Sequence, residues 1–136
     1  MTTIPSRRAI LAGAAAVPAL SLSAIDPIFA AIQKHRAAEA AYVQASEDCE
    51  PSWRGPITEE TYRLEEMVGE LGQKSHEQYK ALLSVTPTTV AGVAALLFHI
   101  CKYEMQYNGG PWENANEDVR ELGFKLLYRV SAVLNA

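Results

Sequence analysis

The chain has 136 residues, of which 49% are hydrophobic, 21% charged and 8% aromatic. This composition fits one globular domain and excludes a disordered or collagen-like chain, while two cysteines are too few for a disulfide-stabilised miniprotein. With 12 basic and 16 acidic residues the formal net charge is −4, so we expect no binding to nucleic acid or to anionic lipid.

Residues 1–24 have the composition of a secretory signal peptide. They contain no acid and only two charged residues, Arg7 and Arg8, which precede an uncharged, alanine-rich run that ends in small residues. The run is too short and too weakly apolar for a stable transmembrane span, and Pro18 interrupts it. We therefore expect a signal peptide over 1–24 and a mature domain over 25–136. An uncleaved N-terminal membrane anchor and an ordinary first helix are the alternatives.

The start of this segment also indicates an export route. The stretch Ser6-Arg7-Arg8-Ala9-Ile10-Leu11 resembles the twin-arginine signal, Ser/Thr-Arg-Arg-x-hydrophobic-Leu-Lys, although Ala12 stands where Lys is usual. Such a signal is an address read by a receptor and not an anchor. The export receptor is therefore one expected partner, and the periplasm is the expected location.

The first two predicted helices follow directly. Asp26-Pro27 combines a capping side chain with proline at the first helical position, and helical spacing of apolar residues then continues to about Glu47. Two prolines and a glycine in 49–56 predict a break. Thr58 is a plausible cap for a second helix, which opens with acids at the positive end of the helix dipole.

Two more helices complete the prediction. Thr86-Pro87 repeats the cap-then-proline pattern, and the following stretch 90–101 has no formal charge, which is typical of a helix buried among others. Asn108 to Pro111 predicts a turn, and a fourth helix should begin near Trp112 or Asn114. No alternating strand pattern is present. We expect an all-α fold, an antiparallel (up-down-up-down) four-helix bundle after the N-terminal signal peptide.

The histidines do not predict a metal site. Di-iron bundles use a Glu-x-x-His pattern on two helices, and this chain has none. At about 1.5 Å per residue, an up-down bundle would place His35, His76 and His99 at three different levels. We expect no metal or other cofactor.

The cysteines allow two interpretations. An exported protein can form disulfides, and Cys49 and Cys101 fall toward the same end of the predicted bundle. The alternative is two free thiols, with Cys101 buried in the apolar third helix.

Aromatic residues gather at one predicted end of the bundle. In an up-down arrangement the first and third loops share an end, which brings together Trp53, Arg54, Tyr107 and Trp112. Tryptophan, tyrosine and arginine are enriched in binding hot spots, so this end is a candidate recognition surface. The alternative is that the tryptophans cover the end of the core.

Two stretches carry a resemblance to a known group of proteins. Together with the leader, the segments 26–38 (Asp-Pro-Ile-Phe-Ala-Ala-Ile-Gln-Lys-His-Arg-Ala-Ala) and 86–97 (Thr-Pro-Thr-Thr-Val-Ala-Gly-Val-Ala-Ala-Leu-Leu) resemble small uncharacterised exported proteins of alphaproteobacteria. The resemblance implies a leader and a helical body, and it implies no catalytic residue.

Motifs for catalysis are missing from the sequence. It contains no nucleophile elbow, Walker loop, dinucleotide-binding fingerprint or zinc-protease helix. The sequence therefore favours a small non-enzymatic helical protein of the cell envelope that acts by binding or interaction. A cofactor-carrying or redox helical bundle, exported in the folded state, is the alternative.

Overall fold

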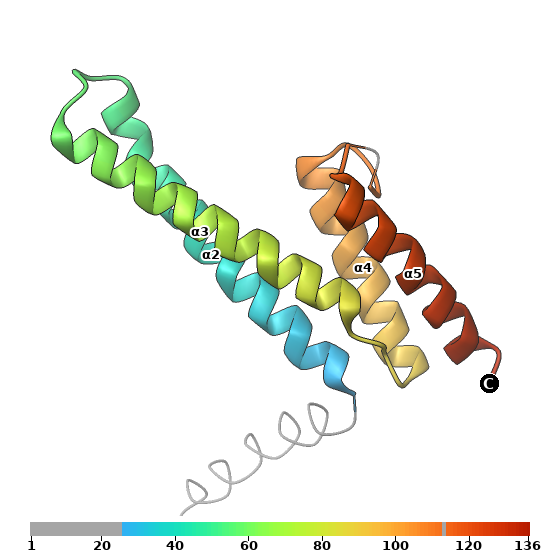
Figure 1. Cartoon of the computed structure of the whole chain (residues 1–136). Helices are drawn as coiled ribbons and strands as arrows, with labels where there is room; N and C mark the ends of the chain where they lie inside the picture. Colours follow the sequence, from blue (N-terminus) through green and yellow to red (C-terminus); the bar gives the residue numbers. More distant parts are fainter. Residues whose placement is uncertain (1–25, 113) are drawn as a thin grey trace, which may run out of the picture.

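The computed structural model describes residues 26–112 and 114–136. Within them the chain is all-α, which confirms the predicted class, and the four helices pack together as a helical bundle. They are α2 (Pro27–Trp53), α3 (Glu59–Ser84), α4 (Val90–Tyr107) and α5 (Glu117–Leu134) (Figure 1). None of these helices is long and apolar enough to cross a membrane. The predicted signal peptide, with Arg7 and Arg8, lies outside the described residues.

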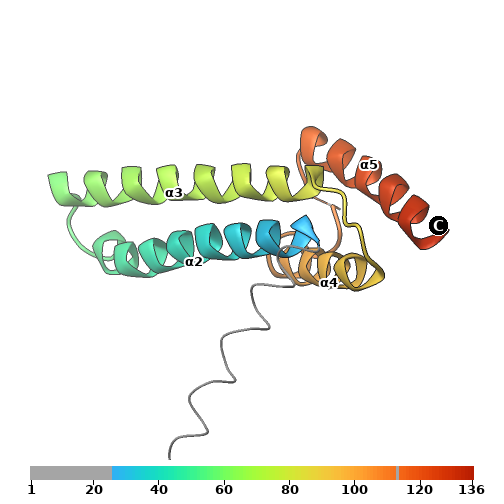
Figure 2. The same ribbon diagram turned by 90° about the horizontal axis from the view of Figure 1, so that it is seen from below.

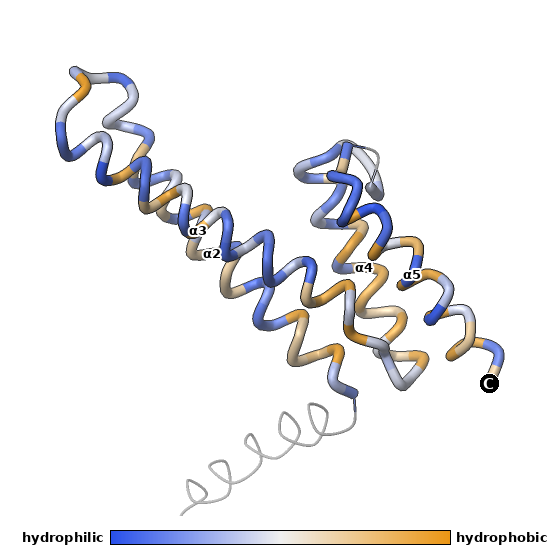
Figure 3. Tube along the Cα trace, in the orientation of Figure 1, coloured by the Kyte–Doolittle hydropathy of each residue, from blue (hydrophilic) through white to orange (hydrophobic). Residues whose placement is uncertain are grey.

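The helices form two hairpins of unequal length. Helices α2 and α3 lie side by side along their whole length, whereas the shorter α4 and α5 pack near the end where α2 begins and α3 finishes (Figures 1 and 2). The turn between α2 and α3 therefore projects well beyond the turn between α4 and α5. The hydropathy of the chain also differs along the bundle, because apolar residues concentrate where the four helices meet (Figure 3). The core is made of Ile28, Ile32, Tyr79, Leu82, Leu83, Val93, Leu96, Ile100, Trp112, Val119, Leu126 and Val130.

Helix α2 begins as predicted and ends later than predicted. Asp26 caps it by accepting a hydrogen bond from the Ile28 backbone N–H at 3.1 Å. The helix continues past Glu47 to Trp53, because Pro51 lies in the last turn and removes only one backbone hydrogen bond there. Burial of Cys49 anchors this last part of the helix.

Helices α4 and α5 also begin later than the sequence pattern suggests. Thr58 caps α3 as predicted, but the cap of α4 is Thr89, whose hydroxyl accepts from the Gly92 N–H at 2.9 Å. Helix α5 begins at Glu117, since Trp112 has a φ of 58°, a left-handed conformation that cannot start a right-handed helix.

Helix α4 is buried on one face only, although its uncharged sequence predicts a helix surrounded by others. Leu96 and Ile100 lie in the core, and Leu97 is half-buried. The opposite face leaves Phe98 and Met105 exposed. The reason is that α4 packs against α2 and α5, and among the described residues no further helix covers its opposite face.

Candidate functional site

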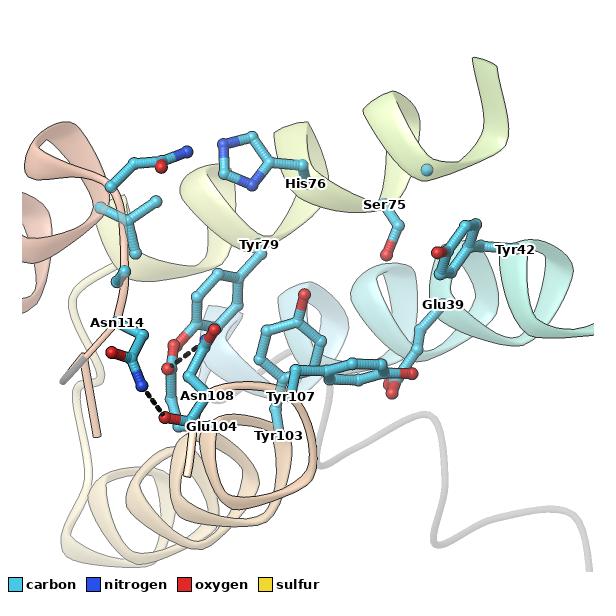
Figure 4. Close-up of a pocket in the computed structure, with 14 residues that line it drawn as sticks. Glu39, Tyr42, Ser75, His76, Tyr79, Tyr103, Glu104, Tyr107, Asn108 and Asn114 are labelled. Atoms are coloured by element: carbon cyan, nitrogen blue, oxygen red, sulfur yellow. Dashed lines mark hydrogen bonds between the residues drawn. The ribbon is translucent and has the colours of Figure 1, made fainter. Parts of the chain in front are cut away.

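A tyrosine-rich pocket lies between α2, α3, α4 and the connection from α4 to α5. Its volume is about 380 Å³, which falls within the range of small-ligand pockets, about 300–1,000 Å³. We call it the tyrosine pocket. In Figure 4, Tyr103 and Tyr107 of α4 lie with Glu39 of α2 on one side of it, and Ser75 and His76 of α3 lie on the other. Its lining residues are Glu39, Tyr42, Gly72, Ser75, His76, Tyr79, Tyr103, Glu104, Tyr107, Asn108, Asn114, Ala115, Asn116 and Val119.

The inner wall of the pocket is a buried hydrogen-bond network. The Tyr79 hydroxyl donates to Glu104 Oε1 and accepts from the Trp112 indole N–H at 3.3 Å. Glu104 Oε2 accepts from Asn108 Nδ2 at 2.6 Å and from the Trp112 backbone N–H at 3.3 Å. Three donors thus converge on a fully buried carboxyl group. A buried polar group needs such partners, and here they fix the wall in one arrangement.

Burial and the neighbouring carboxyl group keep the Tyr79 phenol neutral. Burial raises the pKa of Tyr79 far above its ordinary value, and the hydrogen bond to Glu104 raises it further. Tyr79 therefore acts as a hydrogen-bond donor at this site and not as a phenolate.

The aromatic rings continue from the inner wall toward the surface. The ring centroids of Tyr79 and Tyr103 are 4.5 Å apart, and those of Tyr103 and Tyr107 are 4.9 Å apart. Burial, and then the negative charge of Glu39, raise the pKa of both Tyr103 and Tyr107 to about 12. At neutral pH the pocket therefore presents uncharged tyrosine rings beside the Glu39 carboxyl group.

A histidine pair lies directly behind these rings, which corrects the expectation of three separate levels. Nδ1 of His35 is 2.7 Å from Nε2 of His99, and the His35 ring packs against Tyr103 with centroids 4.7 Å apart. The expected separation of His35 and His99 along the bundle was wrong, because α4 packs beside the first half of α2 and brings the two histidines together. His76 lines the tyrosine pocket from α3.

The pair is neutral at physiological pH. Burial, and then the nearby His99 ring, lower the pKa of His35 to about 4. Burial, and then the nearby charges of Arg36 and Lys102, lower the pKa of His99 to about 4. Within residues 26–112 and 114–136, no group of three or more His, Cys, Asp or Glu side chains is placed to hold a metal ion.

The aromatic end predicted from the sequence is not assembled. Trp53 and Arg54 are exposed at the projecting turn of the α2–α3 hairpin, where Arg54 forms an ion pair with Glu50. Trp112 is buried in the other hairpin, and a Cβ added at Gly123 of α5 would lie only 2.4 Å from its indole. The two loops do not share an end, because α2 has 27 residues and α4 only 18 (Figure 1). Tyr107 alone of the four predicted residues lines the tyrosine pocket.

The cysteines are both free, so the disulfide interpretation is not what the structure shows. The expected burial of Cys101 is also wrong. Cys49 is buried near the end of α2, and Cys101 is exposed on the outer face of α4.

Sequence reasoning did not identify Tyr79 and Glu104, although the sequence contained a signal for each. Glu104 is the only acid in α4, close to the end of a helix that is mostly apolar. Tyr79 lies at helical spacing with Ser75 and Leu82 on the buried face of α3, where its hydroxyl needs a buried partner. A lone acid and a buried tyrosine on different helices of one bundle could have been paired on these grounds.

Comparison of the chain with protein-family models, curated proteins and solved structures finds no match.

Proposed function

We propose that this protein is a small, non-enzymatic binding protein exported to the cell envelope, and that the tyrosine pocket holds its ligand. The observation that carries the proposal is a pocket of about 380 Å³ whose wall is already fixed by the Tyr79–Glu104–Trp112 hydrogen bonds. A wall ordered before binding reduces the entropy that a ligand must overcome.

The export part of the proposal rests on the leader. Arg7 and Arg8 precede an uncharged, alanine-rich run, which supports a twin-arginine signal peptide and a periplasmic location. An up-down-up-down bundle that is exported in the folded state would carry the pocket to the periplasm intact.

Purification of the chain from its native cells, followed by native mass spectrometry, tests the binding function. We expect a bound small molecule that is released on denaturation. Asn116→Trp, at an exposed position of the pocket lining whose side chain makes no capping hydrogen bond, should reduce its occupancy. Asn135→Trp, at the exposed end of α5, is the matched control and should retain the ligand.

Two results would count against the proposal. One is equal occupancy in the two variants, which would place the ligand elsewhere. The other is a visible absorption band from a bound metal or pigment, which would favour the alternative of a cofactor-carrying bundle.

A further inference from the structure

We infer that the tyrosine pocket selects a small organic ammonium cation, held by the Glu39 carboxylate and the faces of the surrounding tyrosine rings. This inference rests on the proposed binding function and adds the chemical class of the ligand.

The charges around the pocket favour a cation. The lining contains two acids, Glu39 and Glu104, and neither lysine nor arginine. Glu104 is occupied by three internal donors. Glu39 is half-buried, and it forms no ion pair within the described part of the chain. The Tyr107 hydroxyl, which hydrogen-bonds to Glu39, is neutral and leaves the negative charge of Glu39 to attract a ligand.

The nearest positive charges do not cancel this preference. Arg36 and Lys102 line the adjacent groove on the other side of Glu39 and Tyr103, and neither forms an ion pair with Glu39. An anionic ligand would lie against the Glu39 carboxylate without a neutralising partner in the lining.

The tyrosine rings of the pocket are the second feature that favours a cation. Tyr42, Tyr79, Tyr103 and Tyr107 line one cavity, and the rings of Tyr79, Tyr103 and Tyr107 contact one another in a row. A cation within about 6 Å of the centre of a tyrosine ring is attracted by the negative face of that ring. Several such faces beside one carboxylate are the arrangement that recognises substituted ammonium groups, and the volume suits a ligand of modest size.

The two tryptophans make the test internally controlled. The Trp112 indole N–H donates to Tyr79, which lines the pocket, whereas Trp53 is exposed at the projecting turn. In a ¹H–¹⁵N correlation spectrum of the full chain, binding in the pocket should shift the Trp112 indole resonance and leave that of Trp53 unchanged.

Three probes of similar shape and different charge separate the possible ligand classes. They are choline, its neutral isostere 3,3-dimethylbutan-1-ol, and the anion 3,3-dimethylbutanoate. We expect saturable shifts of Trp112 with choline, and at least roughly tenfold weaker binding of the alcohol and the anion, as the loss of a favourable charge interaction predicts.

Two pairs of variants identify the groups responsible. Glu39→Gln keeps the shape and removes the charge, and it should weaken choline binding roughly tenfold. Glu66→Gln makes the same change in net charge at an exposed position of α3 outside the pocket lining and should have no effect. Tyr107→Leu should weaken binding roughly threefold or more, whereas Tyr107→Phe keeps the ring and should bind as the native chain does.

The outcomes distinguish the two proposals. If the alcohol or the anion binds as well as choline, the inference of a cation site is overturned and the pocket remains a binding site. If none of the probes shifts Trp112 and the native preparation holds no ligand, the binding function itself fails. Equal binding by Glu39→Gln and the native chain would also overturn the inference.

Discussion

At the scale of single residues, Asp26 connects two parts of the chain that are distant in sequence. Its buried carboxylate caps α2 and also accepts hydrogen bonds from the Thr88 N–H at 3.1 Å and from the Thr89 N–H and hydroxyl at 3.0 and 2.7 Å. The backbone of α4 comes so close that a Cβ at Gly92 would lie 1.9 Å from Asp26 Oδ2. One side chain thus fixes the start of α2 against the start of α4.

The protonation of Asp26 gives this contact a pH dependence. Burial by itself would raise the pKa of Asp26, but the hydrogen bonds from Thr89, Ile28 and Thr88 outweigh burial and lower it below the ordinary value of 3.8. An acid with a lowered folded-state pKa stabilises the fold above its unfolded-state pKa. That stabilisation is lost as the pH falls below about 3.8 and through the folded-state pKa.

Replacing Asp26 by Asn should therefore destabilise the protein mainly at neutral pH. The amide cannot carry the charge that these donors stabilise, and we expect a loss of about 1–3 kcal/mol in the free energy of unfolding at pH 7. The difference from the native chain should shrink at pH 3. Urea unfolding at pH 7 and at pH 3 measures this difference in the free energy of unfolding, and the exposed Asp48→Asn is the control. A loss of equal size at the two pH values would contradict the role of the charge.

At the scale of the elements, α4 shows which expectations the sequence could support. Capping side chains correctly predicted where α2 and α3 begin, because Asp26 and Thr58 act through hydrogen bonds that are local in the chain. The ends were less predictable, since they depend on distant contacts. Trp112 is held in its left-handed conformation by Glu104 and by the space at Gly123, and neither interaction can be seen in the local sequence.

The tyrosine pocket was beyond sequence reasoning for the same reason. Its residues come from all four helices and from the connection between α4 and α5, and they meet only because the shorter hairpin is displaced along the longer one. The expected levels of His35 and His99 are measured from an end shared by the first and third loops, whereas helices α2 and α4, of 27 and 18 residues, end at different levels. Helical periodicity fixes which face a residue lies on and gives no information on how far one helix is shifted along another.

The two faces of α4 should respond differently to truncation. Leu96 is fully buried in the core, so Leu96→Ala should lower the free energy of unfolding by about 2–5 kcal/mol. Phe98, on the opposite face, is 68% exposed, and Phe98→Ala should change the free energy of unfolding by less than about 0.5 kcal/mol. Chemical denaturation of both variants makes the comparison. A large loss for Phe98→Ala would show that another molecule covers this face of α4.

At the scale of the whole molecule, the proposed export signal leads to a prediction that is independent of the helical body. The proposal of twin-arginine export predicts that replacing both Arg7 and Arg8 by Lys traps the precursor in the cytoplasm, because lysine lacks the planar guanidinium groups that the receptor reads. Fractionation of cells followed by sequencing of the N-terminus measures the result.

The same change at two exposed arginines of the body, Arg63→Lys with Arg120→Lys, is the control and should not affect export. Export of the Arg7 and Arg8 double variant at the native rate would contradict the twin-arginine route. Full-length native chain found only in the cytoplasm would contradict export altogether.

The unequal hairpins have a consequence for how the molecule opens. Beyond the reach of α4 and α5, the turn-side parts of α2 and α3 pack only against each other among the described residues, and Figure 3 shows that many of their residues are hydrophilic. Local unfolding from that turn breaks few apolar contacts, so it requires a smaller free energy than opening of the four-helix part. Fraying of this arm can proceed while Tyr79, Glu104 and Trp112 stay in place. The molecule thus combines a projecting part of the α2–α3 hairpin that unfolds locally at low free energy with a more stable four-helix part. The Tyr79–Glu104–Trp112 wall of the tyrosine pocket lies in the four-helix part.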